Sequence, residues 1–203
     1  MNAQGKRSGE TAREYAYRMI REQVISLELK PGEAFNDMEF AAKIGVSRTP
    51  VREAVIQLSE ESRIIEIFPQ RGMRIAPIDV ELVEEARSLR VLLEKQIAGM
   101  CCEMATEEDI KWLQENVGLQ EFYMENSRPE MVMQLDDEMH HKLFMICHRE
   151  LTYGMCQKLA IHYDRIRSLS VNTVKDNTII EDHRKIIQFI AEHKKENAMA
   201  QME

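Results

Sequence analysis

Three side chains in the second half of the chain could bind a metal ion together. Asp136 and His140 are four residues apart in a stretch of helical periodicity, which would place a carboxylate and an imidazole on one helical face. His183, in a later stretch of the same kind, could supply a third ligand across a bundle, and this donor set suits divalent transition metals. With 6 His and 35 Asp and Glu in the chain, such a spacing also arises by chance. The residues alone leave a metal centre and an ordinary polar cluster as alternatives.

One arginine that precedes this candidate site, Arg90, has two alternative roles. Turned into a bundle cavity, its guanidinium could bind a carboxylate through two parallel hydrogen bonds. On the surface it would instead pair with Glu94, one helical turn later, and add roughly 0.3 kcal/mol to stability. We interpret the remaining histidines as surface or structural residues: His141, His148, His162 and His193.

A second group of residues could bind DNA. Residues 45–54, GVSRTPVREA, predict a tight turn and then a helix in which Arg48, Thr49 and Arg52 share one face. Arginine can bind guanine O6 and N7 or phosphate, and threonine can contact a phosphate or a thymine methyl group. Another face of the helix has apolar residues at the spacing i, i+3, i+4, i+7, which predicts that it packs on a core: Val51, Ala54, Val55 and Leu58. Basic residues on a short helix are also common on ordinary solvated faces, so a protein-interaction module remains an alternative.

The elements around this helix predict a small domain over residues 11–78. Helices are expected at 12–27, 37–44 and 48–61 and strands at 64–68 and 73–76, because apolar positions change from helical to alternating spacing. The turn between the strands, Pro69-Gln70-Arg71-Gly72, has glycine where a positive φ is expected. This order of elements is a winged helix–turn–helix, with Arg71 at the tip of the wing, from which it could enter a minor groove.

The rest of the chain, residues 79–203, predicts an all-α bundle that follows a short hinge at residues 77–79. Pro129 is its only proline, no segment alternates as a strand does, and the helical periodicity is continuous. We expect helices over these ranges, with a further helical piece to the end: 80–103, 106–125, 129–148, 150–170 and 178–194.

Charge and composition bound the kind of protein. The net charge is -8, but residues 1–78 carry 12 Lys and Arg against 11 Asp and Glu, so the acidity lies in the second domain. The domain predicted over residues 11–78, which we call the front domain, is so weakly basic that it would bind DNA well only as a dimer or at a specific site. The polar residues 1–10 form no signal peptide, and no apolar run is long enough to span a membrane.

The four cysteines have no zinc-site spacing. We interpret them as reduced core residues of a cytoplasmic protein, with redox sensing as the alternative: Cys101, Cys102, Cys147 and Cys156.

The front domain resembles the GntR family of bacterial transcription regulators. The segments that carry the resemblance stand in the family's order: Lys30-Pro31-Gly32-Glu33, Phe40-Ala41, residues 45–54 and Pro69-Gln70-Arg71-Gly72. The resemblance implies that Arg48, Thr49 and Arg52 contact the operator and that Arg71 and Gly72 form the tip of the wing. Two departures stand out: Met38 replaces a usual arginine, and residues 62–64 replace a usual glycine-leucine pair.

The back domain resembles the all-helical ligand-sensing (FCD-type) domain of the FadR subgroup of that family. The motifs are Arg90-x2-Leu93-Glu94, Leu135-Asp136-x3-His140 and Glu181-Asp182-His183-x2-Ile186. The resemblance implies that Asp136, His140 and His183 bind a divalent ion, zinc or nickel, and that Arg90 helps to hold a small carboxylate effector. It also implies a fourth ligand, a histidine that would fall just past Glu203. Either the ligand lies beyond this chain, or water or effector completes a three-residue site.

Taken together, the sequence predicts a mostly α protein that regulates transcription. It would bind a palindromic DNA operator as a homodimer and respond to a carboxylate effector at a metal site. The alternatives are a metal-dependent hydrolase, for which no separate general base stands out, and a protein-interaction module.

Overall fold

The computed structural model describes residues 5–173 and 178–202, and its contacts divide the chain into two compact units. We call the first the head unit; it comprises the chain up to Val83 together with Lys158–Ser168. The second, the bundle unit, comprises Glu84–Gln157 and the chain from Leu169 onward. Residues 1–4 of the polar stretch 1–10 lie outside the described residues. No helix in the described part of the chain is long and apolar enough to cross a bilayer.

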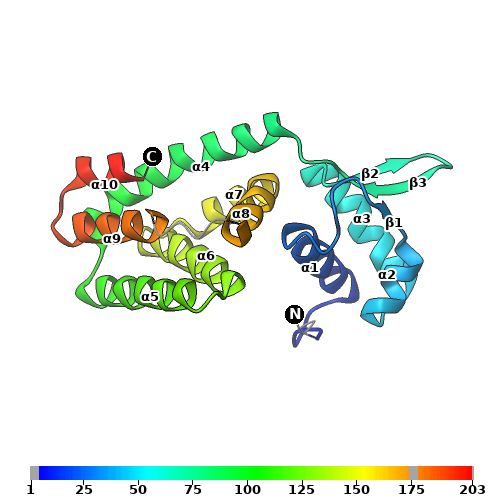
Figure 1. Cartoon of the computed structure of the whole chain (residues 1–203), viewed down its shortest axis with the longest axis horizontal. Helices are drawn as coiled ribbons and strands as arrows, with labels where there is room; N and C mark the ends of the chain where they lie inside the picture. Colours follow the sequence, from blue (N-terminus) through cyan, green and yellow to red (C-terminus); the bar gives the residue numbers. More distant parts are fainter. Residues whose placement is uncertain (1–4, 174–177, 203) are drawn as a thin grey trace. The chain divides into compact units, whose positions relative to one another are not determined.

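The head unit contains three helices and a small antiparallel sheet from the front of the chain (Figure 1). Their bounds are α1 (Ala12–Ile25), β1 (Ala34–Phe35), α2 (Asp37–Ile44), α3 (Arg48–Ser62), β2 (Ile65–Phe68) and β3 (Gly72–Ile75). The strand order is β1-β3-β2, with Ile65 opposite Ile75 and Phe35 opposite Met73. The predicted winged helix–turn–helix is therefore present, with β1 as an additional strand.

Local sequence explains where the head helices begin and end. Thr11 and Glu14 form a reciprocal capping box that starts α1. Asn36 caps α2 by accepting hydrogen bonds from the backbone of Met38 and Glu39. Gly45 ends α2 in a left-handed conformation with φ of 74°, which favours glycine because it has no Cβ. Asn36 therefore sets the start of α2, and Gly45 sets the turn between α2 and α3.

The core of the head unit is apolar and continuous. The faces of α1 and α3 that meet each other are fully buried, and the inner strand residues close the core: Ala16, Ile20, Val24, Val51, Val55, Leu58, Ile65 and Ile75. Ile161, from far along the sequence, belongs to the same core.

Ile161 comes from α8 (Ile161–Thr173), and the start of this helix packs within the head unit. His162 Nε2 lies 2.7 Å from the carbonyl oxygen of Ser62, at the end of α3. Arg165 is fully buried and donates to the carbonyl oxygens of Ala76 and Pro77, at 2.8 and 3.4 Å. These contacts tie the end of α3 and the segment after β3 to a helix from the second half of the sequence.

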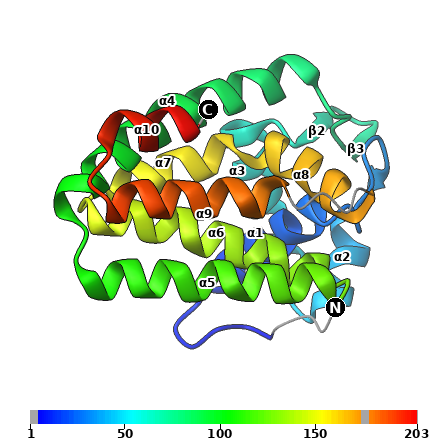
Figure 2. The ribbon, with the colours of Figure 1, turned by 60° about the vertical axis from the view of Figure 1, so that its left-hand side comes forward.

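The bundle unit is built from helices that pack around one apolar core. Their bounds are α4 (Val80–Met104), α5 (Glu107–Glu125), α6 (Pro129–Ile146), α7 (Glu150–Leu159), α9 (Thr178–Ala191) and α10 (Lys195–Gln201). In Figure 2, α5, α6 and α9 run side by side, and their inner residues form the centre of the core. The prediction of a single helix over 150–170 is wrong, because this segment forms two helices, α7 and α8, with a break at Ala160.

Three of the four cysteines lie in the core of the bundle unit, as the sequence predicts, and Cys156 does not belong to that core. Cys101, Cys102 and Cys147 are buried, Cys156 is half-buried, and all are free thiols. The sulfur atoms of Cys101 and Cys147 are 3.5 Å apart.

Candidate functional site

The predicted DNA-binding residues lie together on the exposed face of α3. The side chains of Arg48 and Arg52 are 55% and 62% exposed, and Thr49 is exposed between them. With Glu53 and Ile56 they line a shallow open hollow. On the opposite face of the helix the apolar residues are fully buried, so the core fixes the orientation of the arginines.

A buried acid that the sequence analysis did not single out contacts both arginines. Asp37, on α2, is 2% exposed. Its Oδ1 accepts a hydrogen bond of 2.9 Å from Nε of Arg48, and its Oδ2 lies 3.9 Å from Nη1 of Arg52. The carboxylate therefore restrains the guanidinium of Arg48 through Nε and lies close to that of Arg52, while both side chains stay more than half exposed.

The wing is the tight connection between β2 and β3. Arg71 donates its backbone N–H to the carbonyl oxygen of Phe68 at 3.0 Å, and its side chain is exposed. Gln70 and Gly72 have φ of 60° and 100°, and Gly72 adopts its value without steric cost. Arg71 thus lies at the tip of an exposed hairpin.

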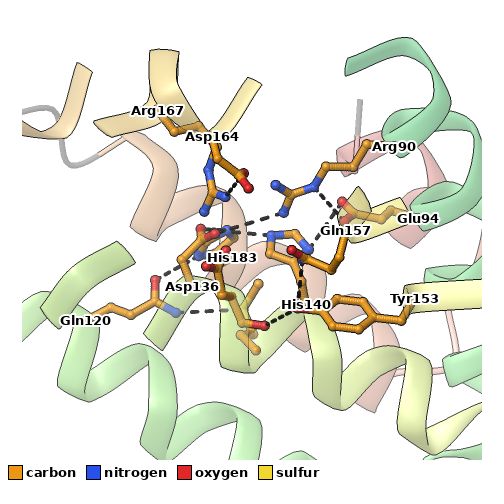
Figure 3. A network of polar contacts seen from close by, with 12 residues as sticks. Arg90, Glu94, Gln120, Asp136, His140, Tyr153, Gln157, Asp164, Arg167 and His183 are labelled. Atoms are coloured by element: carbon orange, nitrogen blue, oxygen red, sulfur yellow. Dashed lines mark hydrogen bonds and ion pairs between the residues drawn. The ribbon is translucent and has the colours of Figure 1, made fainter. Parts of the chain in front are cut away.

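The predicted metal ligands come together in the bundle unit. Asp136 and His140 lie on α6 and His183 lies on α9, and each is at most 7% exposed. One ligand atom from each lies within 4.8 Å of the other two (Figure 3). Oδ1 of Asp136 is 3.4 Å from Nε2 of His183 and 3.9 Å from Nε2 of His140.

The separation of Asp136 and His183 matches that of two ligands of one ion, and the separation of Asp136 and His140 is slightly longer. Ligand atoms about 2.1 Å from a tetrahedral ion lie about 3.4 Å from one another. The set of one carboxylate and two imidazoles also matches the ligands that zinc and other divalent transition metals accept. The residues present therefore fit a divalent ion.

Arg90 lies beside this site, on α4, with its side chain 14% exposed. Its Nε donates to Oε1 of Glu94 at 2.7 Å, which is the i, i+4 pair considered from the sequence, but Glu94 is buried and Arg90 is half-buried. Nη2 of Arg90 is also 3.9 Å from Oδ2 of Asp136. The arginine therefore contacts a candidate metal ligand directly.

Two further polar residues contact the imidazoles and were not recognised as site residues in the sequence. Oε2 of Glu94 lies 3.2 Å from Nδ1 of His140, a close ionic contact and not an aligned hydrogen bond. Oε1 of Gln120, on α5, lies 2.9 Å from Nδ1 of His183. The spacing to Arg90 pointed to Glu94, but no local signal distinguishes Gln120 from the other glutamines.

The environment of Glu94 favours its ionised form. Burial acts to raise the pKa of this carboxyl, but the nearby His140 and Arg90 and the hydrogen bond from Arg90 outweigh burial and lower the pKa to about 2. The site thus holds a buried carboxylate between an imidazole and a guanidinium.

The remaining histidines have structural or surface positions. His162 and His193 contact backbone carbonyl oxygens, of Ser62 and Cys102 respectively. His141 stacks on Tyr153, and His148 is exposed.

Comparison with known proteins assigns both halves of the chain. Residues 12–75 match the bacterial regulatory proteins of the gntR family, and residues 85–203 match the FCD domain. The HTH-type transcriptional repressor RspR of Escherichia coli is 30% identical over 158 residues, which are 78% of this chain and 69% of RspR. The Nta operon transcriptional regulator of Aminobacter aminovorans is 27% identical over 177 residues, covering 87% and 82% of the two chains.

A solved structure has the same fold. The E. coli protein McbR/YncC aligns with a TM-score of 0.77 at 18% identity, over 94% of this chain and 91% of that one. The matching families and relatives are transcriptional regulators and not enzymes, so the hydrolase alternative is set aside. This chain is a DNA-binding transcription regulator that belongs to the GntR family and has an FCD domain.

Proposed function

We propose that this regulator binds a palindromic operator as a homodimer and that a small carboxylate effector, held at a divalent metal in the bundle unit, adjusts its affinity for DNA. One observation supports this DNA-binding face: the two sides of α3 differ in side-chain type and exposure. Arg48 and Arg52 are exposed on one side, and the aliphatic residues of the other are fully buried. Such a helix can enter a major groove while its back stays anchored in the head core.

The individual contacts follow from side-chain chemistry. Arg48 and Arg52 would bind guanine edges or phosphates, and Thr49 a phosphate or a thymine methyl group. Arg71 would enter the adjacent minor groove, where Gly72 permits the tight turn that presents it. Met38 is 61% exposed at the start of α2, so its lack of charge removes one potential phosphate contact.

The DNA-binding face is tested by replacing both arginines of α3. The probe is the duplex that wild-type protein enriches from a random-sequence library. We expect Arg48→Ala with Arg52→Ala to weaken binding about 30-fold or more, since each arginine–guanine contact contributes about 1–3 kcal/mol. The charge-matched control is Arg13→Ala with Arg87→Ala, two exposed arginines outside this face. Equal affinities of the two double variants for the duplex would contradict the proposal that this face binds DNA.

The metal centre would consist of Asp136, His140 and His183. A bound zinc or nickel ion would supply an electrophilic position for a carboxylate oxygen of the effector. Arg90 would bind the same carboxylate, because its guanidinium already lies near Asp136 and offers paired N–H donors. The effector is thereby expected to be a small carboxylic acid.

The metal centre is tested by metal content. Protein purified without chelators is expected to contain about one zinc or nickel ion per chain, and Asp136→Ala with His183→Ala is expected to contain almost none. Asp182→Ala with His148→Ala, at a half-buried aspartate and an exposed histidine, is the matched control. Equal metal content in both double variants would show that Asp136 and His183 do not bind the ion.

A homodimer is the expected assembly. A palindromic operator matches a protein with two-fold symmetry, and two weakly basic head units bind more tightly together than singly. In the bundle unit, large apolar side chains are exposed on α7 and α4, which supports burial against a second copy: Leu151, Met155 and Leu92. Sedimentation of purified protein at micromolar concentration measures the assembly directly.

A further inference from the structure

Asp37 contacts both arginines of α3 but cannot itself reach DNA. The residue is 2% exposed and occupies the first position of α2, where the helix N-terminus attracts negative charge. Its burial excludes a direct contact between the carboxylate and a base edge. Asp37 can therefore act on DNA binding only through its charge or through the residues that it contacts.

The charge of Asp37 alone opposes DNA binding. A carboxylate beside a face that meets phosphates repels them, whatever the base sequence. The front of the chain has little positive charge to offset this repulsion, because residues 1–78 carry 12 Lys and Arg against 11 Asp and Glu. If charge were its only effect, replacing Asp37 with a neutral residue would tighten binding to every duplex.

The hydrogen bond with Arg48 provides an opposing effect. Oδ1 of Asp37 accepts at 2.9 Å from Nε of Arg48, whose side chain is 55% exposed. The two Nη atoms of Arg48 make no hydrogen bond to any residue that the structure describes. A guanidinium has two edges for a paired contact, one that contains Nε and one formed by both Nη atoms. With Nε held by Asp37, the edge left for guanine O6 and N7 is the end-on pair of Nη atoms.

Arg52 approaches the other oxygen of the same carboxylate without bonding to it. Nη1 of Arg52 lies 3.9 Å from Oδ2 of Asp37, and this buried oxygen has no hydrogen-bond partner within the described part of the chain. Asp37 thus restrains Arg48 through a hydrogen bond and attracts Arg52 through charge alone. The two arginines differ in freedom, and Arg48 is the one whose orientation is set before DNA binds.

We propose that Asp37 is a positioning residue that fixes Arg48 for end-on contact with a guanine and so increases the preference of this regulator for its operator over other DNA. The inference rests on the DNA-binding face proposed above and names the residue that gives this face its selectivity. A restrained guanidinium loses less side-chain entropy when it binds one base edge, whereas a free one adapts to phosphates of any sequence. Asp37 therefore lowers the affinity for DNA in general and raises it for the operator.

The two effects of Asp37 are separated by comparing two duplexes. The first is the duplex that wild-type protein selects from the random library, and the second is a shuffled duplex of the same length and base composition. We expect Asp37→Ala to weaken binding to the selected duplex about 5-fold and to leave binding to the shuffled duplex unchanged or tighter. The charge control is Glu39→Gln, which removes an exposed charge from the same helix and keeps the oxygen that accepts from Asn36. This control is expected to bind both duplexes as tightly as wild type or slightly more tightly.

A double-mutant cycle tests whether Asp37 acts through Arg48. In Arg48→Ala protein, Asp37→Ala is expected to cause no further loss of affinity for the selected duplex, because the residue through which it acts is gone. Asp37→Asn keeps an acceptor oxygen and is expected to lose less operator preference than Asp37→Ala. All variants are compared at a temperature at which circular dichroism shows them to be folded.

A measurement on wild-type protein needs no folded variant of Asp37. Proton–nitrogen NMR of arginine-labelled protein without DNA reports how fast each Nε–H group exchanges with water. The Nε–H of Arg48 is expected to exchange more slowly than that of the exposed Arg13, because it is hydrogen-bonded to a buried oxygen. Equal exchange rates for the two groups overturn the inference.

The outcomes separate this inference from the proposed face. Normal binding of the selected duplex by Arg48→Ala with Arg52→Ala overturns the face and this inference together. Weak binding by that double variant, together with normal or tighter binding by Asp37→Ala, overturns only the role of Asp37. An equal loss of affinity for the selected and shuffled duplexes in Asp37→Ala also overturns that role, since positioning predicts a change in preference.

Discussion

At the scale of single residues, buried acids control where the functional arginines lie. Asp37 holds Arg48 on the exposed face of α3, and Glu94 holds Arg90 beside the candidate metal ligands. Arginine is long and flexible, so a fixed carboxylate reduces the entropy that ordering the side chain costs on binding. The sequence pointed to the arginines by type and spacing, but the burial of Asp37 depends on packing between two helices and has no local signature.

His162 leads to a prediction about pH. Burial lowers the pKa of this imidazole below its ordinary 6.5, and the nearby Arg165 lowers it too, although the hydrogen bond to Ser62 opposes them. As pH falls through about 6.5 the unfolded imidazole takes up a proton that the folded one resists, so the stability that neutral His162 provides is complete above that pH and decreases below it.

We therefore compare unfolding free energies of wild type and His162→Gln by chemical denaturation. The advantage of wild type is expected to shrink between about pH 7.5 and pH 5.5. The exposed His148→Gln should show no such change. An advantage of wild type that stays constant or grows on acidification would contradict the buried, neutral state of His162.

At the scale of elements, the helix ends that glycine, proline or a capping residue specifies were predictable. Gly45 ends α2 and Pro129 begins α6, as the sequence indicated. The strand β1 was missed because it has only two residues and exists through pairing with β3. The break between α7 and α8 was missed because Ala160 is a good helix former, so tertiary packing decides it.

Two caps at equivalent positions provide a matched prediction. The side chain of Asn36 caps α2, whereas Ser47, at the start of α3, makes no side-chain cap bond. Asn36→Ala is therefore expected to lower the unfolding free energy by about 1 kcal/mol, and Ser47→Ala by only about 0.3 kcal/mol. Denaturation followed by circular dichroism measures both, with Asn36→Asp as the variant that retains the cap. Equal losses at the two positions would show that the cap on α2 contributes nothing specific.

At the scale of the whole molecule, the FCD part of the sequence contributes a helix to the head unit. Residues 85–203 match the FCD domain, yet Lys158–Ser168 packs with the winged helix–turn–helix through Ile161, His162 and Arg165. Composition and periodicity located the two halves of the chain. They did not predict that Lys158–Ser168 packs in the head unit. In the sequence Arg165 looks like an exposed helical arginine, and only the structure shows its contacts with Ala76 and Pro77.

Because part of the FCD sequence packs in the head unit, we expect ligand binding in the bundle unit to be linked to DNA binding by the head unit. The chain on both sides of Lys158–Ser168 belongs to the bundle unit, which contains the candidate metal ligands. If the proposed coupling exists, an ion or effector changes the affinity for DNA by the same factor by which DNA changes the affinity for that ion or effector.

The most direct test is an anisotropy titration of the selected duplex with wild-type protein, with bound zinc and after its removal by a chelator. We predict that the Kd changes about 5-fold or more, the usual lower range for coupled sites, and that Asp136→Ala with His183→Ala abolishes the change. A Kd that is the same with and without bound zinc in wild-type protein would contradict the account.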